Sequence, residues 1–152
     1  MSHVVSIAVE IGTDADSLAA IKQVCRELGL VFKQGQKTYR WWGYSVGDYA
    51  LPAGFTAEDL GKCEHAIGIP GTTWEVGLAR PKNAKGLRLL FDFFGSQGRP
   101  ILEALGGEKA NKFVQLYGVA KAEIAAKKLG HSVARQTLKN GSINLTITGR
   151  TL

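Results

Sequence analysis

Cysteine is scarce in this sequence of 152 residues. There are two, Cys25 and Cys63, and they are not spaced as a Cys-x-x-Cys pair. This argues against a small domain that is cross-linked by disulfides, because such a domain needs a larger set of closely spaced cysteines. Because free thiols persist in reducing compartments, we expect a cytoplasmic protein.

Long hydrophobic runs are also absent. No stretch of about 18 consecutive apolar residues, the length that a membrane-spanning helix needs, occurs in the chain. The first residues, MSHVVSIAVEIG, lack the basic start and the small-residue cleavage site of a secretory leader. The sequence therefore predicts a soluble, unprocessed protein with no membrane partner.

Side chains that perform hydrolytic or metal chemistry are few and dispersed. The three histidines, His3, His65 and His131, are too far apart in sequence to indicate a triad with a nucleophile and a carboxylate. Cys63 and His65 would share one face of a strand, but two ligands do not make a metal site. We predict no catalytic residue, no metal ligand and no cofactor, and we lean toward a protein without enzymatic activity.

The composition is that of one folded domain. Hydrophobic residues make up 45% of the chain and charged residues 21%, so we expect a single α+β domain over residues 1–152. At this length roughly two thirds of the unfolded surface can be buried, which is enough for a core without a metal or a disulfide. The net charge of +6 favours anionic partners. A basic surface without such a role is equally common.

The first part of the chain predicts a strand, a helix and a hairpin. Residues 3–11 are β-branched and partly alternating, which favours a strand. Thr13 or Asp14 can cap the following helix, and Gly29 ends it. The apolar face of this helix is predicted to consist of Leu18, Ile21, Cys25 and Leu28. Residues 30–32 and 37–42, joined by a turn at 34–36, predict a hairpin.

The middle of the chain predicts a loop and then a meander. Residues 43–62 contain four glycines and a proline, which indicates a loop with one short helical turn near 56–60. Residues 65–69, 74–79 and 87–94 predict three antiparallel strands, of which the last is the most hydrophobic and should be central. Asp92 interrupts that strand. Since burying an ionised carboxylate is costly, we expect Asp92 to face solvent.

The last third of the chain predicts two helices and a second hairpin. Residues 100–105 form a short helix with a proline near its first turn, and residues 109–129 form a long helix. Residues 132–138 and 142–148 form a hairpin around Asn140-Gly141, a pair that favours a type I′ turn. The fold class is therefore α+β, with a mostly antiparallel sheet of six to seven strands and two main helices packed on one face.

Both ends of the chain resemble a known family. The start, MSH followed by a strand and a helix ending in LG at 28–29, is similar to the hypothetical chloroplast reading frame 35 family, also called domain of unknown function 1257. The end is similar too, with YGVAK at 117–121, KLG at 128–130 and NGSINL at 140–145. The middle of the chain departs from that pattern. The resemblance implies no established activity and no catalytic residue. It implies a bacterial, plastid or viral origin and, as a partner, an ATPase of the AAA type.

An aromatic and basic cluster around residue 40 is the best candidate for a contact surface. Aromatic rings can stack on bases while cations neutralise phosphate. The candidate ligand-binding residues are Lys37, Tyr39, Arg40, Trp41, Trp42 and Tyr44, joined by Trp74, Arg80, Lys82, Lys85 and Arg88. On strand alternation, Tyr39 and Trp41 share one face and Arg40 and Trp42 the other, so one face should be core.

Three functions are consistent with this cluster. The first is a non-catalytic binding protein for an anionic ligand, most simply a nucleotide or nucleotide-derived signal, which a viral protein could sequester from a host defence. The second is a nucleic-acid-binding protein whose affinity would fall with salt. The third is an interaction module that binds an ATPase partner or forms a homo-oligomer through exposed aromatic residues.

Overall fold

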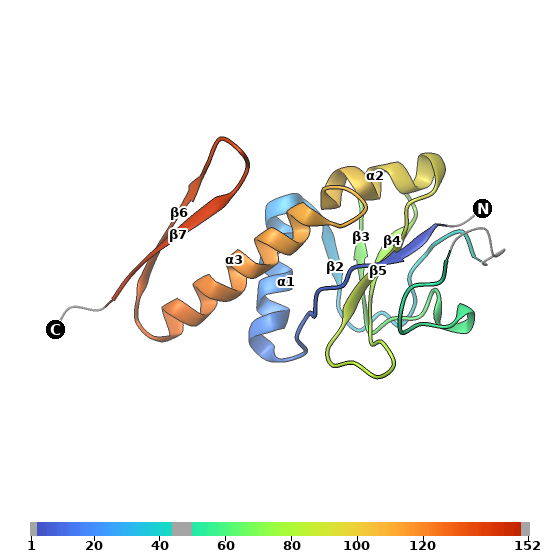
Figure 1. Cartoon of the computed structure of the whole chain (residues 1–152), viewed down its shortest axis with the longest axis horizontal. Coiled ribbons are helices and arrows are strands. Elements are labelled where there is room, and N and C mark those ends of the chain that lie inside the picture. The colour runs from blue at the N-terminus through green and yellow to red at the C-terminus, as the bar shows by residue number, and fades with distance from the viewer. Residues whose placement is uncertain (1–2, 44–49, 150–152) are drawn as a thin grey trace.

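A five-stranded antiparallel sheet forms the centre of the computed structural model, which describes residues 3–43 and 50–149 (Figure 1). Its strands lie in the order β1–β5–β4–β3–β2. They are β1 (Val4–Ser6), β2 (Val31–Lys33), β3 (His65–Gly68), β4 (Glu75–Ala79) and β5 (Arg88–Asp92). The predicted meander is confirmed, because β3 pairs with β4 and β4 pairs with β5. As predicted, β5 is an inner strand.

Three helices share one hydrophobic cluster with the sheet, which makes the chain α+β. They are α1 (Ala15–Leu28), α2 (Gly95–Leu105) and α3 (Asn111–Lys128). The cluster joins Ile21 of α1, Ile101 of α2 and Phe113 of α3 to Val76 and Leu78 of β4. Side chains alternate along a strand, so Glu75, Gly77 and Ala79 of β4 face the opposite side of the sheet. None of the helices in residues 3–43 and 50–149 is long and apolar enough to cross a membrane.

The opposite side of the sheet is covered by the segment between β2 and β3. Its described residues Tyr39, Phe55 and Leu60 are buried against Ala66 of β3 and Ala79 of β4. The short helical turn predicted in this segment is confirmed as η1 (Ala57–Asp59). The sheet therefore has a helical layer on one side and an irregular layer on the other.

The boundaries of the helices agree with the sequence in part. Gly29 ends α1 with a left-handed φ of 70°, as predicted. Asp14 is the N-cap residue of α1, but its carboxylate accepts a hydrogen bond from the Ser17 hydroxyl instead of a backbone N–H. The helix predicted from Pro100 begins earlier, at Gly95, so the proline lies inside α2.

The hairpin predicted over residues 30–42 is wrong. Strand β2 pairs with β3, in a register that places Val31 opposite Gly68. Residues 37–42 form no strand beside β2, and Thr38 only makes an isolated bridge with Lys62. The chain turns at Gly35, whose positive φ of 78° suits glycine, and crosses toward the start of β4.

Asp92 is buried, contrary to the prediction that it faces solvent. Its carboxylate accepts hydrogen bonds from the backbone N–H groups of His3 at 3.0 Å, Trp42 at 3.3 Å and Phe94 at 3.0 Å. Several N–H donors can stabilise a buried carboxylate that would otherwise be costly. Asp92 therefore ties together the N-terminal strand, the aromatic segment and the start of α2.

The C-terminal hairpin is confirmed, but it forms a sheet of its own, so the seven strands do not belong to one sheet. Among the described strands, β6 (Ser132–Thr137) and β7 (Ile143–Thr148) pair with each other alone, and they project beyond α3 (Figure 1). The predicted type I′ turn is wrong, because only Gly141 has a positive φ, of 87°. The turn does lie at Lys139, Asn140 and Gly141, as predicted, and the Leu138 N–H donates to the Ser142 carbonyl oxygen.

Tyr39→Phe is expected to stabilise the protein. The Tyr39 hydroxyl is buried, and the described part of the chain offers it no hydrogen-bond partner. A buried polar group without a partner costs about 1–3 kcal/mol, so its removal should raise the free energy of unfolding by about 1 kcal/mol. Urea unfolding measures the difference. A clear loss of stability in the phenylalanine variant would reveal a bonding partner for the hydroxyl.

Candidate functional site

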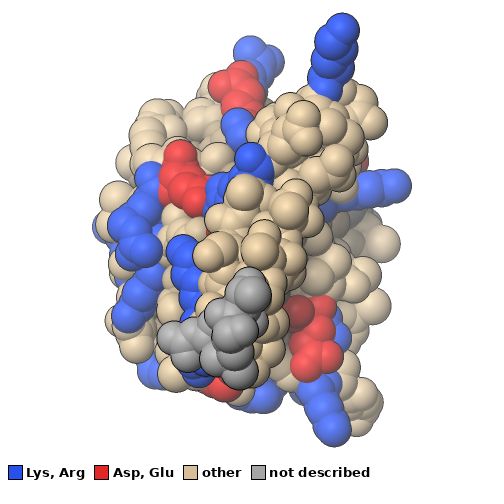
Figure 2. Space-filling model, turned by 90° about the vertical axis from the view of Figure 1, so that its left-hand side faces the viewer, with Lys and Arg blue, Asp and Glu red and all other residues tan. Residues whose placement is uncertain are grey.

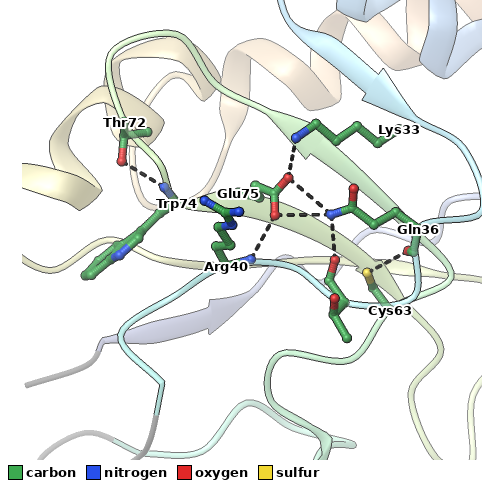
Figure 3. Close-up of polar contacts among 8 residues, drawn as sticks. Lys33, Gln36, Arg40, Cys63, Thr72, Trp74 and Glu75 are labelled. Atoms are coloured by element: carbon green, nitrogen blue, oxygen red, sulfur yellow. Dashed lines mark hydrogen bonds and ion pairs between the residues drawn. The ribbon is translucent and has the colours of Figure 1, made fainter.

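A surface hollow of about 330 Å³ opens at the end of the sheet where β4 begins. Strand β2, the turn between β3 and β4, and the backbone around Arg40 form its walls (Figure 3). Its volume is at the lower end of the range for small-molecule pockets. The hollow is lined by Val31, Lys33, Arg40, Gly68, Ile69, Pro70, Thr72, Thr73, Trp74 and Glu75.

A buried carboxylate, Glu75, holds the two basic walls of the hollow together. It accepts hydrogen bonds from Lys33 Nζ at 2.6 Å, from Gln36 Nε2 at 3.1 and 3.2 Å, and from the Arg40 backbone N–H at 3.0 Å. The Glu75 N–H in turn donates to the Arg40 carbonyl oxygen at 2.9 Å. The Arg40 backbone is thus bonded to Glu75 twice, which fixes where its side chain begins.

The carboxylate of Glu75 is stabilised in its charged form. Burial alone would raise its pKa, but the hydrogen bonds from Lys33, Gln36 and the Arg40 backbone hold the pKa below its ordinary value. Glu75 is therefore ionised near neutral pH and offsets the charge of Lys33. The two cations that line the hollow outnumber this carboxylate, so one positive charge is left over.

The charged group available to a ligand is the Arg40 guanidinium, while Trp74 lines the hollow with its side chain packed against the hydrophobic cluster that the sheet shares with the helices. Within residues 3–43 and 50–149, the guanidinium has no hydrogen-bond or ion-pair partner, and the residue is exposed. Trp74 is half-buried at the start of β4. In Figure 3 the Arg40 side chain rises beside Glu75 toward the turn that leads into Trp74, and Lys33 lies on the other side of Glu75.

The turn that forms the far wall is bonded to α2. Gln97 Oε1 accepts hydrogen bonds from the Thr72 hydroxyl at 2.6 Å and from the Thr73 N–H at 3.2 Å. The Thr72 hydroxyl oxygen also accepts the Trp74 N–H at 3.1 Å. These bonds connect the backbone that leads into Trp74 to α2, so the fold holds this wall of the hollow in place.

The other aromatic candidates lie outside this hollow. Tyr39 is 3% exposed, so the expectation that its ring contacts a ligand is wrong. Its ring lies over Gly77 of β4, where no side chain occupies the space. Trp41 is half-buried against the second hydrophobic cluster, and its indole lies over Gly61. Trp42 is 43% exposed and does not line the hollow. Tyr44 lies outside the described residues.

The basic candidates from the β4–β5 turn are not part of the hollow either. They follow the end of β4, whereas Trp74 precedes its start, so the length of a strand separates them. Arg80 pairs with Glu64 at 3.1 Å. Lys82 and Arg88 line a separate hollow of about 290 Å³, and Lys85 is exposed nearby. The predicted convergence of the aromatic segment with this turn is wrong.

Lys37 is exposed on the segment before Arg40, but it does not line the hollow. Sequence reasoning did bring Arg40 and Trp74 into one candidate set, and the fold places both on the hollow. It missed Glu75, and it placed Lys33 beside the aromatic cluster without choosing it as a ligand-binding residue. The available signal was a lone carboxylate at the start of an otherwise uncharged strand, since such a residue needs a partner when it is buried.

The described thiols and histidines do not form a reactive site. Cys25 and Cys63 are buried, and burial raises the pKa of each thiol to about 12, so both stay protonated near neutral pH. His65 Nδ1 accepts the Gly35 N–H at 2.8 Å, and burial lowers the pKa of its imidazole. Among the residues that the structure describes, no group of three His, Cys, Asp or Glu side chains could hold a metal ion.

No protein-family model, curated protein or solved structure matches the chain. The resemblance to the chloroplast reading frame family therefore stays a prediction.

Proposed function

We propose that the hollow beside Arg40 and Trp74 binds a small anionic ligand that contains a planar ring, with a nucleotide or nucleotide-derived molecule as the best chemical match. The observation behind this proposal is the Arg40 guanidinium, which has no partner among the described residues, in a hollow that Trp74 also lines and that carries an excess of positive charge. A guanidinium that no described side chain engages is available for a phosphate or carboxylate.

Arg40, Trp74 and Glu75 have different roles in this proposal. The planar Arg40 fork can donate two parallel hydrogen bonds to a phosphate or carboxylate, which a lysine cannot do. The Trp74 ring offers a flat surface on which a base can stack. Glu75 positions both basic walls through its bonds to Lys33 and to the Arg40 backbone. Sequestration of the ligand needs no chemical step, so in this proposal the protein binds its ligand in the cytoplasm without transforming it.

Thermal melting with a panel of mononucleotides, dinucleotides and short oligonucleotides tests the proposal. A ligand that binds only the folded state at 100 times its Kd should add about 2.7 kcal/mol and raise the Tm by roughly 5–10 °C. Arg40→Ala should weaken binding by about tenfold to a hundredfold, because a charge-assisted hydrogen bond is lost.

Lys37→Ala is the matched control. It removes one positive charge from an exposed position three residues from Arg40 but outside the hollow, so the Tm shift should persist. Flat melting curves across the panel at millimolar ligand would refute the proposal. Salt-dependent binding of oligonucleotides that is lost in Arg88→Ala and kept in Arg40→Ala would move the function to the β4–β5 turn.

A further inference from the structure

In the hairpin formed by β6 and β7, the outer edge of β7 carries backbone N–H and C=O groups that no described strand pairs with. β7 pairs with β6 on one side and, in the part of the chain that the structure describes, with no strand on the other. Its sequence is INLTIT, six residues without a charge or a proline. Natural proteins usually block an exposed edge with a lysine, a proline or a bulge, because free backbone groups attract another strand. β7 has none of these devices.

The backbone groups that β7 turns outward are those of its apolar residues. Leu138 donates to the Ser142 carbonyl oxygen at 2.8 Å, which identifies this pair as hydrogen-bonded. Hydrogen-bonded and non-bonded pairs alternate along an antiparallel ladder, so Asn144 and Thr146 face β6 with their backbone groups. Ile143, Leu145 and Ile147 therefore present their N–H and C=O groups to the free edge.

The apolar face of the hairpin is incompletely covered. Val133, Ile143, Leu145 and Ile147 share this face, and Ile147 is 47% exposed. On the same face, Arg135 of β6 donates to Glu123 of α3 and to Glu27 of α1. α3 contacts both strands of the hairpin, and the hydrogen bonds of Arg135 anchor β6 to α3 and α1.

We propose that β7 pairs in antiparallel fashion with β7 of a second copy of this chain, around a two-fold axis at Leu145. In that register Leu145 faces its own copy, and Ile143 faces Ile147 of the other chain. Asn144 faces Thr146 on the polar side. Apolar residues meet apolar residues on one face and polar residues meet polar residues on the other, which is the condition for a stable register.

The same register also satisfies the backbone. The three apolar residues of β7, whose N–H and C=O groups point outward, are the ones that meet across the axis, so each pair can exchange two N–H···O bonds. The result is a four-stranded sheet in the order β6–β7–β7–β6, which is more stable than an isolated two-stranded hairpin. An edge that no described strand covers, and that complements itself in both side chains and backbone, points to a second copy.

The outward face of the hairpin places no charge in the way of this pairing. Ser132, Ala134 and Gln136 of β6 lie beside Asn144, Thr146 and Thr148 of β7 on this face. Figure 2 shows the end of the molecule from which the hairpin projects, with uncharged side chains along its middle and a mixture of Lys or Arg and Asp or Glu side chains to either side. On this face, the residues beside the paired edge are therefore uncharged.

Sedimentation velocity from micromolar to near-millimolar protein tests the proposal. The wild-type chain should approach twice its 16.3 kDa mass as concentration rises. Asn144→Lys combined with Thr146→Lys places like charges opposite one another twice across the axis. This double variant should dimerise at least about tenfold more weakly, because like charges directly opposite on a sheet are destabilising.

The matched control is Ala134→Lys combined with Gln136→Lys, which adds the same charge to the same face on β6, away from the edge. It should dimerise like the wild type. Mixing the β7 lysine variant with Asn144→Glu/Thr146→Glu should restore a dimer, which an unfolded hairpin could not do. A wild-type chain that stays monomeric throughout, a β7 lysine variant that still dimerises, or equal losses in both lysine variants would overturn the proposal.

Discussion

Gly77→Ala is expected to lower the free energy of unfolding by about 3 kcal/mol, since overpacking a filled core forces side chains and backbone to move. A Cβ atom at Gly77 would lie 2.3 Å from Cδ1 of the buried Tyr39 ring. The ring is buried between β4 and the layer that contains Phe55 and Leu60, so it has little room to move away from an added Cβ. Chemical denaturation of the purified variant gives the change directly.

Gly118→Ala serves as the control for that substitution. Gly118 lies on an exposed position of α3, and an added Cβ would meet nothing within 4 Å. Alanine should stabilise the helix by about 0.5–1 kcal/mol. Combining Gly77→Ala with Tyr39→Leu should cost less than the sum of the single changes, because the two residues contact each other. Additive costs would show that the ring is not what fills the space.

Glu75→Gln should cost about 2–3 kcal/mol of stability at neutral pH, because the amide cannot accept all the donors that the carboxylate satisfies. The Gln36 amide or the Arg40 backbone N–H would lose its acceptor, and Lys33 would lose its ion-pair partner. Since Arg40 is positioned by Glu75, ligand binding should weaken along with stability. Denaturation and ligand melts on one variant measure both effects.

The pH dependence of this cost has a definite sign. The pKa of Glu75 is lower in the folded protein than its ordinary value. Its contribution to the free energy of unfolding is therefore fully present above the pKa that Glu75 has in the unfolded chain, about 4.3. The contribution is lost as the pH falls below that value toward the folded pKa. The difference between wild type and Glu75→Gln should therefore narrow below about pH 4.3. A constant difference from neutral to acid pH would refute the charged role of Glu75.

Local patterns predicted the helices and the meander because the relevant signals are local. Gly29 and the helical spacing of apolar residues define α1, and short apolar runs between turn residues define β3, β4 and β5. The hairpin at 30–42 was predicted from proximity alone. It is wrong because β2 finds its partner in β3, at Gly68, which no local pattern specifies.

The site was only partly predictable for the same reason. Arg40 and Trp74 could be chosen as candidates by residue type. Whether Tyr39 contacts a ligand depends on Gly77, far along the chain, whose missing side chain leaves room for the ring. Glu75 lies 35 positions from its donor Arg40 and 42 from its donor Lys33, so a lone carboxylate could signal the need for a partner but not which residues supply it.

The most direct test of ligand binding at the hollow is an NMR titration that follows the side-chain indole N–H signals. The chain has three tryptophans, and each lies in a different setting, so each reports on a different surface. Titration with AMP or GMP should shift the Trp74 indole and the Arg40 backbone amide, while the exposed Trp42 indole stays unchanged. Shifts confined to Trp42 or to the β4–β5 turn, or no shifts at millimolar nucleotide, would contradict the proposal.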